Sequence, residues 1–243
     1  MNIDTLITLG YYISSIGFLV ASLVTFDAVR KSGTSGLKIV LTYLFIGTSI
    51  FFIITIFQKL GAEFFGIADE SMDIWWHLMF YLAMFSFYFG FKKLANLGGT
   101  DSANSAVTSS GAKSWGIFSA IVLVVIFLIP SWAEPWINAY TASRIAELGA
   151  HHFLAFVMAG VVGAYLLSAK IFLGQIGRAI ASPMIIAIWA LSIQHFWELL
   201  TESWKVIDLT SDKIEGGEKI FLIIAAVCVT SAALRLKSFA TKQ

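Results

Sequence analysis

The 243-residue sequence contains a single cysteine, three prolines and few charged residues. The lone Cys228 excludes an intramolecular disulfide and any zinc or iron-sulfur motif built from several cysteines. Only 13% of the residues are charged, whereas 58% are hydrophobic and 15% are aromatic, which is unlike a soluble domain. The sequence also lacks a glycine-rich phosphate loop, a nucleophile elbow and a basic face for nucleic acid. The composition therefore predicts an integral membrane protein whose partner is the lipid bilayer, not nucleic acid.

Apolar runs of about 20 residues, the length that crosses roughly 30 Å of hydrocarbon, recur along the chain. There are seven, near residues 5–29, 37–58, 74–92, 115–132, 151–171, 183–204 and 219–237. We predict an all-α, polytopic membrane protein with seven transmembrane helices in one domain, residues 1–243. The polar loop after the third run divides it into a three-helix group (1–93), a cytoplasmic loop with a linking helix (94–135) and a second three-helix group (136–243).

The charges predict the orientation, because Lys and Arg are retained on the cytoplasmic side during insertion. With the N-terminus outside, 13 of the 15 acidic residues lie outside, and only Asp27 and Asp101 lie inside. The inner side then holds 11 of the 16 basic residues: Arg30, Lys31, Lys38, Lys92, Lys93, Lys113, Lys170, Arg178, Arg235, Lys237 and Lys242. This favours an N-out, C-in protein of the plasma (cytoplasmic) membrane. The first run carries Asp4 and no basic n-region, so we interpret it as a retained helix.

The second and sixth runs resemble each other in the order of a glycine, a basic residue, an apolar span and a terminal leucine. This similarity suggests a 3+1+3 layout in which the two three-helix groups are parallel repeats. The alternative is a chance similarity between apolar helices. A true repeat would favour a site between the two groups.

Ionisable residues within the sixth run are the strongest functional signal. In SIQHFWELLTESW, residues 192–204, the side chains of His195, Glu198 and Glu202 project from one sector of about 60° on a helix. The other histidines, His77, His151 and His152, fall in the same outer half of the membrane. At about 1.5 Å per residue, His77, His195 and Glu198 lie roughly 18 to 22 Å from the inner boundary, and His151 and Glu202 lie about 28 Å from it. Helix tilt shifts such depths by several ångströms, so residues at both depths can belong to one joint site.

Imidazoles and carboxylates from three helices match the ligands that hold first-row metals in helix bundles. Asp73 precedes His77 by four residues and Glu147 precedes His151 by four, so each carboxylate can orient an imidazole if the helix extends that far. We therefore predict a transition-metal site for zinc, copper or iron facing the extracytoplasmic side. If it is catalytic, whether redox or hydrolytic, the metal activates water or dioxygen, with Glu198 as proton acceptor. The candidate ligands are His77, His151, His152, His195, Glu198 and Glu202.

The same residues also have explanations that need no metal. Asp73, Glu147 and Glu202 can be solvated helix ends, and a buried hydrogen bond between His195 and Glu198 can hold helices together without a metal. His151 and His152 point about 100° apart, so at most one is expected to face a given site. The tryptophans predict an aromatic belt at the interface: Trp75, Trp76, Trp132, Trp136, Trp197 and Trp204.

Other functional classes remain open. Haem b electron transfer would use His77 or His152 together with His195 as axial ligands. Proton- or cation-coupled transport would use His195 and Glu198 as a relay. A chain so rich in phenylalanine can also be an accessory subunit that packs on other membrane subunits, or a homo-oligomer. Retinal chemistry is excluded because the last run has no central lysine, and the seven-helix zinc hydrolases' His-x-x-x-His is missing from it.

Overall fold

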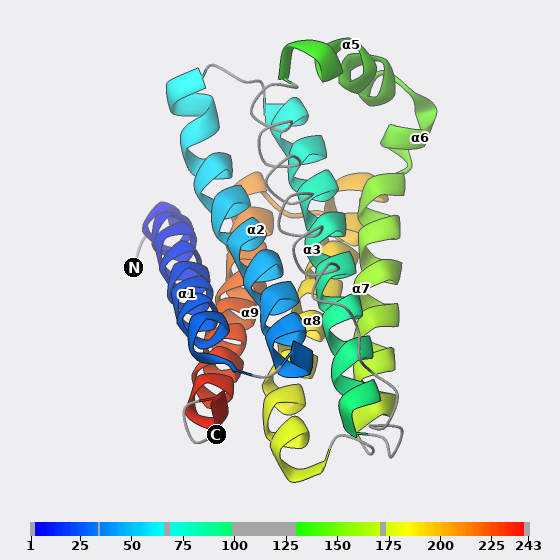
Figure 1. Cartoon of the computed structure of the whole chain (residues 1–243). Helices are drawn as coiled ribbons and strands as arrows, with labels where there is room; N and C mark the ends of the chain where they lie inside the picture. Colours follow the sequence, from blue (N-terminus) through cyan, green and yellow to red (C-terminus); the bar gives the residue numbers. More distant parts are fainter. Residues whose placement is uncertain (1–2, 34, 66–68, 99–129, 171–173, 241–243) are drawn as a thin grey trace.

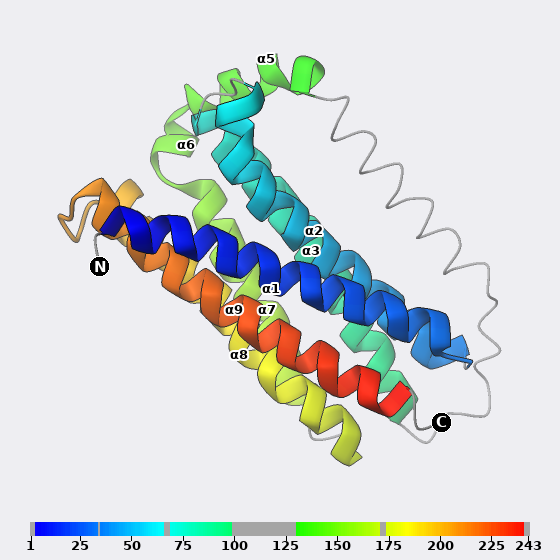
Figure 2. The same ribbon diagram turned by 90° about the vertical axis from the view of Figure 1, so that its left-hand side faces the viewer.

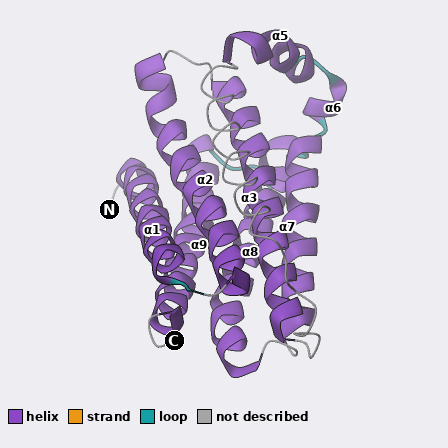
Figure 3. Ribbon diagram, viewed as in Figure 1, coloured by secondary structure: helices purple, strands orange, loops and turns teal. Residues whose placement is uncertain are grey.

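A computed structural model describes residues 3–33, 35–65, 69–98, 130–170 and 174–240. These residues are almost entirely helical and include no strand (Figure 3), which confirms the all-α class. The helices are α1 (Ile3–Lys31), α2 (Ser35–Phe65), α3 (Asp69–Gly98), α5 (Pro130–Thr141), α6 (Arg144–Glu147), α7 (Ala150–Ala169), α8 (Gly174–Glu198), the π-helix η2 (Leu199–Ser203) and α9 (Ser211–Ala240).

Six of these helices contain segments long and apolar enough to cross a membrane. They are α1, α2, α3, α7, α8 together with η2, and α9. The predicted fourth span, residues 115–132, lies outside the described residues except for 130–132, which belong to α5. A multi-pass membrane protein is therefore supported, while the seventh span, the orientation and the repeat remain predictions.

The six long helices form a closed ring in the order α1, α2, α3, α7, α8 and α9, with α1 packed along α9 (Figures 1 and 2). In this ring α3 and α7 begin, and α8 ends, at the same end of the bundle. The short helix α5 lies across that end (Figure 1). We call it the histidine end, because the starts of α3 and α7 and the end of α8 carry all four histidines.

Small residues allow the helices to approach closely. Close packing matters in a membrane because lipid tails are as apolar as the side chains, so the hydrophobic effect does not drive the helices together. A Cβ atom added at Gly10 of α1 would lie 2.5 Å from Cβ of Lys219 in α9, and one at Gly17 would lie 2.9 Å from Cβ of Ala226. The hydroxyl of Thr230 donates a 2.8 Å hydrogen bond to the carbonyl of Gly17. These contacts close the ring between the first and last helices.

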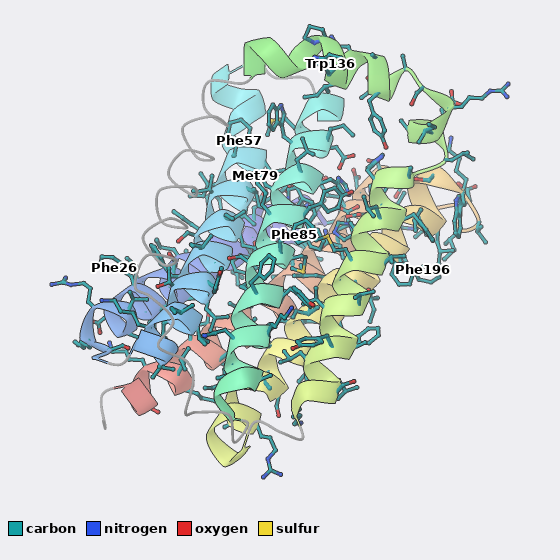
Figure 4. All side chains as sticks on the ribbon, turned by 45° about the vertical axis from the view of Figure 1, so that its right-hand side comes forward. Phe26, Phe57, Met79, Phe85, Trp136 and Phe196 are labelled. Carbon is teal, nitrogen blue, oxygen red and sulfur yellow. The ribbon has the colours of Figure 1, made fainter. Side chains whose placement is uncertain are left out.

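The outer surface of the bundle is apolar. Phe26, Phe85 and Phe196 are 44%, 51% and 39% exposed, and Figure 4 shows Phe26 and Phe196 at opposite sides of the bundle. Inside, by contrast, buried hydroxyls such as those of Thr25 and Thr55 donate to carbonyls of their own helices. This distribution fits a protein surrounded by hydrocarbon, where every polar group must be satisfied internally.

Stacked aromatic rings connect the centre of the bundle to the histidine end. Phe18 stacks on Phe51 with ring centroids 4.9 Å apart, and Phe51 meets Phe80 edge to face at 5.9 Å. Phe80 in turn packs edge to face against the imidazole of His195 at 4.4 Å. Side chains of α1, α2 and α3 thus fix the position of a histidine on α8.

Close packing of α2 on α3 should make Gly47 intolerant of even one added carbon. A Cβ at Gly47 would overlap the ring of the fully buried Phe87, whereas a Cβ at Gly160 would make only a 3.6 Å contact with Ser192. Gly47→Ala should lower the free energy of unfolding by about 1 to 3 kcal/mol relative to Gly160→Ala, the usual range for overpacking. Unfolding of both variants in the same detergent measures the difference. Equal stabilities would contradict the packing.

Candidate metal centre

Three long helices and η2 bring the predicted site residues together at the histidine end. Asp73 and His77 come from the first three turns of α3, and His151 and His152 come from the first turn of α7. The last turns of α8 and η2 supply the rest: His195, Glu198 and Glu202. His77, His152, His195 and Glu198 are buried and offer ligand atoms that all lie within 4.8 Å of one another. We call these four residues the His/Glu cluster.

The carboxylate of Glu198 lies at the centre of the cluster. Its Oε2 atom accepts hydrogen bonds from Nδ1 of His195 at 2.6 Å and Nδ1 of His152 at 2.8 Å. Its Oε1 atom accepts from the side-chain amide of Gln194 at 3.0 Å. A carboxylate that is only 7% exposed within a membrane bundle is thus surrounded by donors from two helices.

The imidazole of His77 faces the same carboxylate in a different way. Its Nδ1 lies 2.8 Å from the backbone carbonyl of Asp73, which can only accept, so Nδ1 carries the proton. In the neutral ring Nε2 is then an acceptor, and it lies 3.9 Å from Oε2 of Glu198 with no hydrogen-bond partner among the described residues. Two acceptors therefore face each other in a buried place. A cation between them, either a second proton on the ring or a metal ion, would remove this conflict.

The spacing of the cluster is close to that of a metal site. Tetrahedral zinc with bonds of about 2.1 Å separates its ligand atoms by roughly 3.4 Å. The distances from Glu198 Oε2 to the three imidazole nitrogens are 2.6, 2.8 and 3.9 Å, on both sides of that value. A metal bound at Nδ1 of His152 and His195 would take the place of the hydrogen-bonding protons there, which would move to Nε2 of each ring.

A second group of ligand atoms adjoins the first. Asp73, His151 and His152 also offer atoms within 4.8 Å of one another. The Asp73 carboxylate lies 3.1 Å from Nε2 of His151 and 3.3 Å from Nδ1 of His77, so it supports imidazoles on α3 and α7. Although Asp73 is 42% exposed, its carboxylate contacts two imidazoles, so it is not only a solvated helix end.

The expectation that only one of His151 and His152 faces a given site is wrong. Both rings lie 4.7 Å from the ring of His77, and their own centroids are 4.1 Å apart. Their Cβ atoms do point in different directions, but an imidazole reaches several ångströms further and can turn back toward a shared neighbour. His152 belongs to both groups of ligand atoms, and it connects the two predicted depth levels.

His151 is held by Asp73 and by Tyr140 of α5. The Tyr140 hydroxyl lies 3.1 Å from Nδ1 of His151. Burial raises the pKa of this hydroxyl, so it is protonated at neutral pH and can donate to Nδ1. The Nε2 proton of His151 then points toward Asp73, and both nitrogens of this ring are satisfied. This is unlike His77 and His195, each of which has an unpartnered buried Nε2 among the described residues.

The predicted pairing of Glu147 with His151 does not form, because its condition of a continuous helix fails. α6 ends at Glu147, and Gly149 takes a left-handed backbone conformation with φ of 71° before α7 begins at Ala150. Glu147 is exposed, and His151 contacts Asp73 instead. The glycine turn breaks the four-residue register on which the expected pair depended.

Glu202 lies at the edge of the site. It belongs to η2, where the backbone N–H of Trp204 donates to the carbonyl five residues earlier, at Leu199. The prediction that Glu202 shares one face with His195 and Glu198 assumed a regular α-helix, and this wider turn changes the register between them. Glu202 Oε2 lies 3.7 Å from Nε2 of His152, and the side chain is 46% exposed. Glu202 is therefore at an entrance to the cluster, outside the set of four buried ligands.

Sequence reasoning missed two side chains that contact the cluster. Trp76 is only 5% exposed and packs edge to face against His195 at 5.1 Å, so the aromatic-belt interpretation is wrong for this residue. Gln194, 3% exposed, binds Glu198 through its amide. Their signals were present: Trp76 adjoins His77, and Gln194 precedes Glu198 by one helical turn.

Comparison of the chain with protein-family models, with curated proteins and with solved structures finds no match. The function is therefore inferred from the geometry of the site alone.

The left-handed turn at Gly149 should be essential for placing His151 and His152. A Cβ there would overlap Oγ and Cβ of Ser203, and the left-handed conformation itself costs a non-glycine residue about 1 to 2 kcal/mol. Gly149→Ala should therefore lower the melting temperature. The double variant Gly149→Ala/Ser203→Gly should recover the part due to the overlap and keep the conformational part. No difference between the single and double variants would contradict the contact.

Proposed function

We propose that this protein binds one transition-metal ion through His77, His152, His195 and Glu198 in the outer half of its transmembrane bundle. The single observation that supports this most is the buried Nε2 of His77, which has no hydrogen-bond partner among the described residues and lies 3.9 Å from the Glu198 carboxylate. A divalent cation would accept the Nε2 lone pair and compensate the buried carboxylate at the same time. Three imidazoles and a carboxylate without thiolate suit zinc, copper or iron.

A purely structural role for the His195–Glu198 hydrogen bond accounts for less of the geometry. It explains the 2.6 Å contact, but it gives no partner to the buried Nε2 atoms of His77 and His195. Buried polar atoms without partners are rare and call for a ligand or water. In the proposed site, Nε2 of His77 binds the metal ion.

Haem b receives no support from the ring positions. An iron with two axial histidines needs the imidazoles on opposite faces of a porphyrin. Here the rings of His77 and His195 have centroids 5.0 Å apart and are tilted against each other, and Trp76 and Phe80 pack directly on His195. The described side chains thus fill the space that a porphyrin would need.

Metal analysis of the purified protein tests the proposal. We expect about one zinc, copper or iron ion per chain in the wild type. His195→Ala and His152→Ala should weaken binding by at least 10- to 100-fold, the loss seen when even a supporting group of a ligand is removed. His151→Ala is the matched control, because it removes the neighbouring imidazole outside the cluster and should retain the ion.

Equal metal content in the wild type, His152→Ala and His195→Ala, with folding intact, would contradict the site. An absorption spectrum of the same samples provides an independent check, since a Soret band would indicate haem instead.

The proposed orientation, with the histidine end outside the cell, can be tested separately. In a Cys228→Ala background, an impermeant thiol reagent should label Ser211→Cys, at the exposed start of α9, from outside. Ser109→Cys, in the loop predicted to be cytoplasmic, should be labelled only after the membrane is permeabilised. The reverse pattern would place the cluster on the cytoplasmic side.

A further inference from the structure

A cavity of about 340 Å³ adjoins the His/Glu cluster. Glu198 and His152 line it on one side, and Tyr11 of α1 with Lys219 of α9 line it on another. Its lining also includes Glu202, which is 46% exposed, whereas Glu198 is only 7% exposed. The cavity therefore connects the buried carboxylate of Glu198 to the exposed carboxylate of Glu202. The cavity is therefore the described space through which a small solute could reach Glu198.

Carboxylates dominate the lining. Five acidic residues face this space: Asp73, Glu198, Glu202, Glu215 and Glu218. The only lysine or arginine in the lining is Lys219, which is 2% exposed. Its ammonium lies 3.6 Å from Glu218, 4.0 Å from Glu215 and 4.0 Å from the ring centroid of Tyr11. Acidic side chains outnumber the one ammonium in this lining, so the cavity favours cations over anions.

Two buried polar atoms in the same lining have no partner among the described residues. The amide nitrogen of Gln194 donates to Glu198, which leaves its carbonyl Oε1 unpartnered although the side chain is 3% exposed. Nε1 of Trp76 is likewise unpartnered, at 5% exposure. An oxygen acceptor next to the carboxylates suits the water shell of a hydrated cation, and the indole N–H suits an oxygen of that shell.

We propose that this acidic cavity is the entry path by which a hydrated divalent transition-metal cation reaches the His/Glu cluster. This inference rests on the proposed metal centre. Glu202, Glu215 and Glu218 raise the local cation concentration, and the Gln194 carbonyl contacts the shell of the ion beside Glu198. The ion then exchanges its waters for Nε2 of His77 and for Nδ1 of His152 and His195, and the Nδ1 proton of each of these two rings moves to Nε2 of the same ring. The excess of carboxylates selects free cations over negatively charged metal complexes.

The rate of Zn²⁺ binding to the metal-free full-length protein in neutral detergent micelles tests this path. A fluorescent zinc indicator in a stopped-flow instrument follows the reaction. Glu215 is 38% exposed and accepts a 3.2 Å hydrogen bond from Tyr11, which a glutamine can also accept. Glu215→Gln should slow binding by about 3- to 10-fold at low ionic strength, and Glu215→Lys should slow it further. High salt should reduce both effects.

The matched control is Glu147→Gln, which removes one exposed carboxylate outside the cavity lining and should leave the rate unchanged. Each variant should still bind one zinc at equilibrium, because neither residue is in the cluster. An unchanged rate in both Glu215 variants, with one zinc bound, would overturn the entry path and leave the metal centre standing. Failure of the wild type to bind zinc, copper or iron would instead overturn the proposed function.

Discussion

The carboxylate of Glu198, buried among membrane-spanning helices, sets the constraint on which the histidine end is built. An ionised group in such a place is tolerated only with partners, because hydrocarbon offers neither water nor counter-ions. Two helices meet this need, because α8 contributes His195 and Gln194 and α7 contributes His152. The helix α3 adds His77, whose Nε2 lies 3.9 Å from the carboxylate without a hydrogen bond. The histidine end is thus organised around one negative charge.

Much of the surrounding structure serves to position those partners. The aromatic series from Phe18 to Phe80 ends on the ring of His195, and the carbonyl of Asp73 fixes which nitrogen of His77 carries the proton. The turn at Gly149 begins α7 where His151 and His152 both reach the site. Positions far from the cluster along the chain therefore determine its geometry, as supporting groups do in metal sites generally.

The sequence was sufficient to predict the membrane class and the main partners of the site, since ionisable residues in apolar runs are conspicuous. His195 and Glu198 could be found in this way, and Asp73 with His77 by their helical spacing. The pairing of Glu147 could not be judged, because a left-handed turn at Gly149 has no certain signature in the sequence. The burial of Trp76, Gln194 and Lys219 could not be predicted, because it depends on which helices are neighbours, and helix order in the ring is not encoded in local patterns.

The contact between the first and last helices of the ring has a consequence for biosynthesis. Tyr11 on α1 and Lys219 on α9 form one wall of the acidic cavity, and they are separated by nearly the whole length of the chain. During translation this wall is incomplete until α9 leaves the ribosome and packs on α1. A nascent chain already holds His77, His152 and His195, but the cavity beside them lacks the wall that Lys219 forms until α9 is inserted.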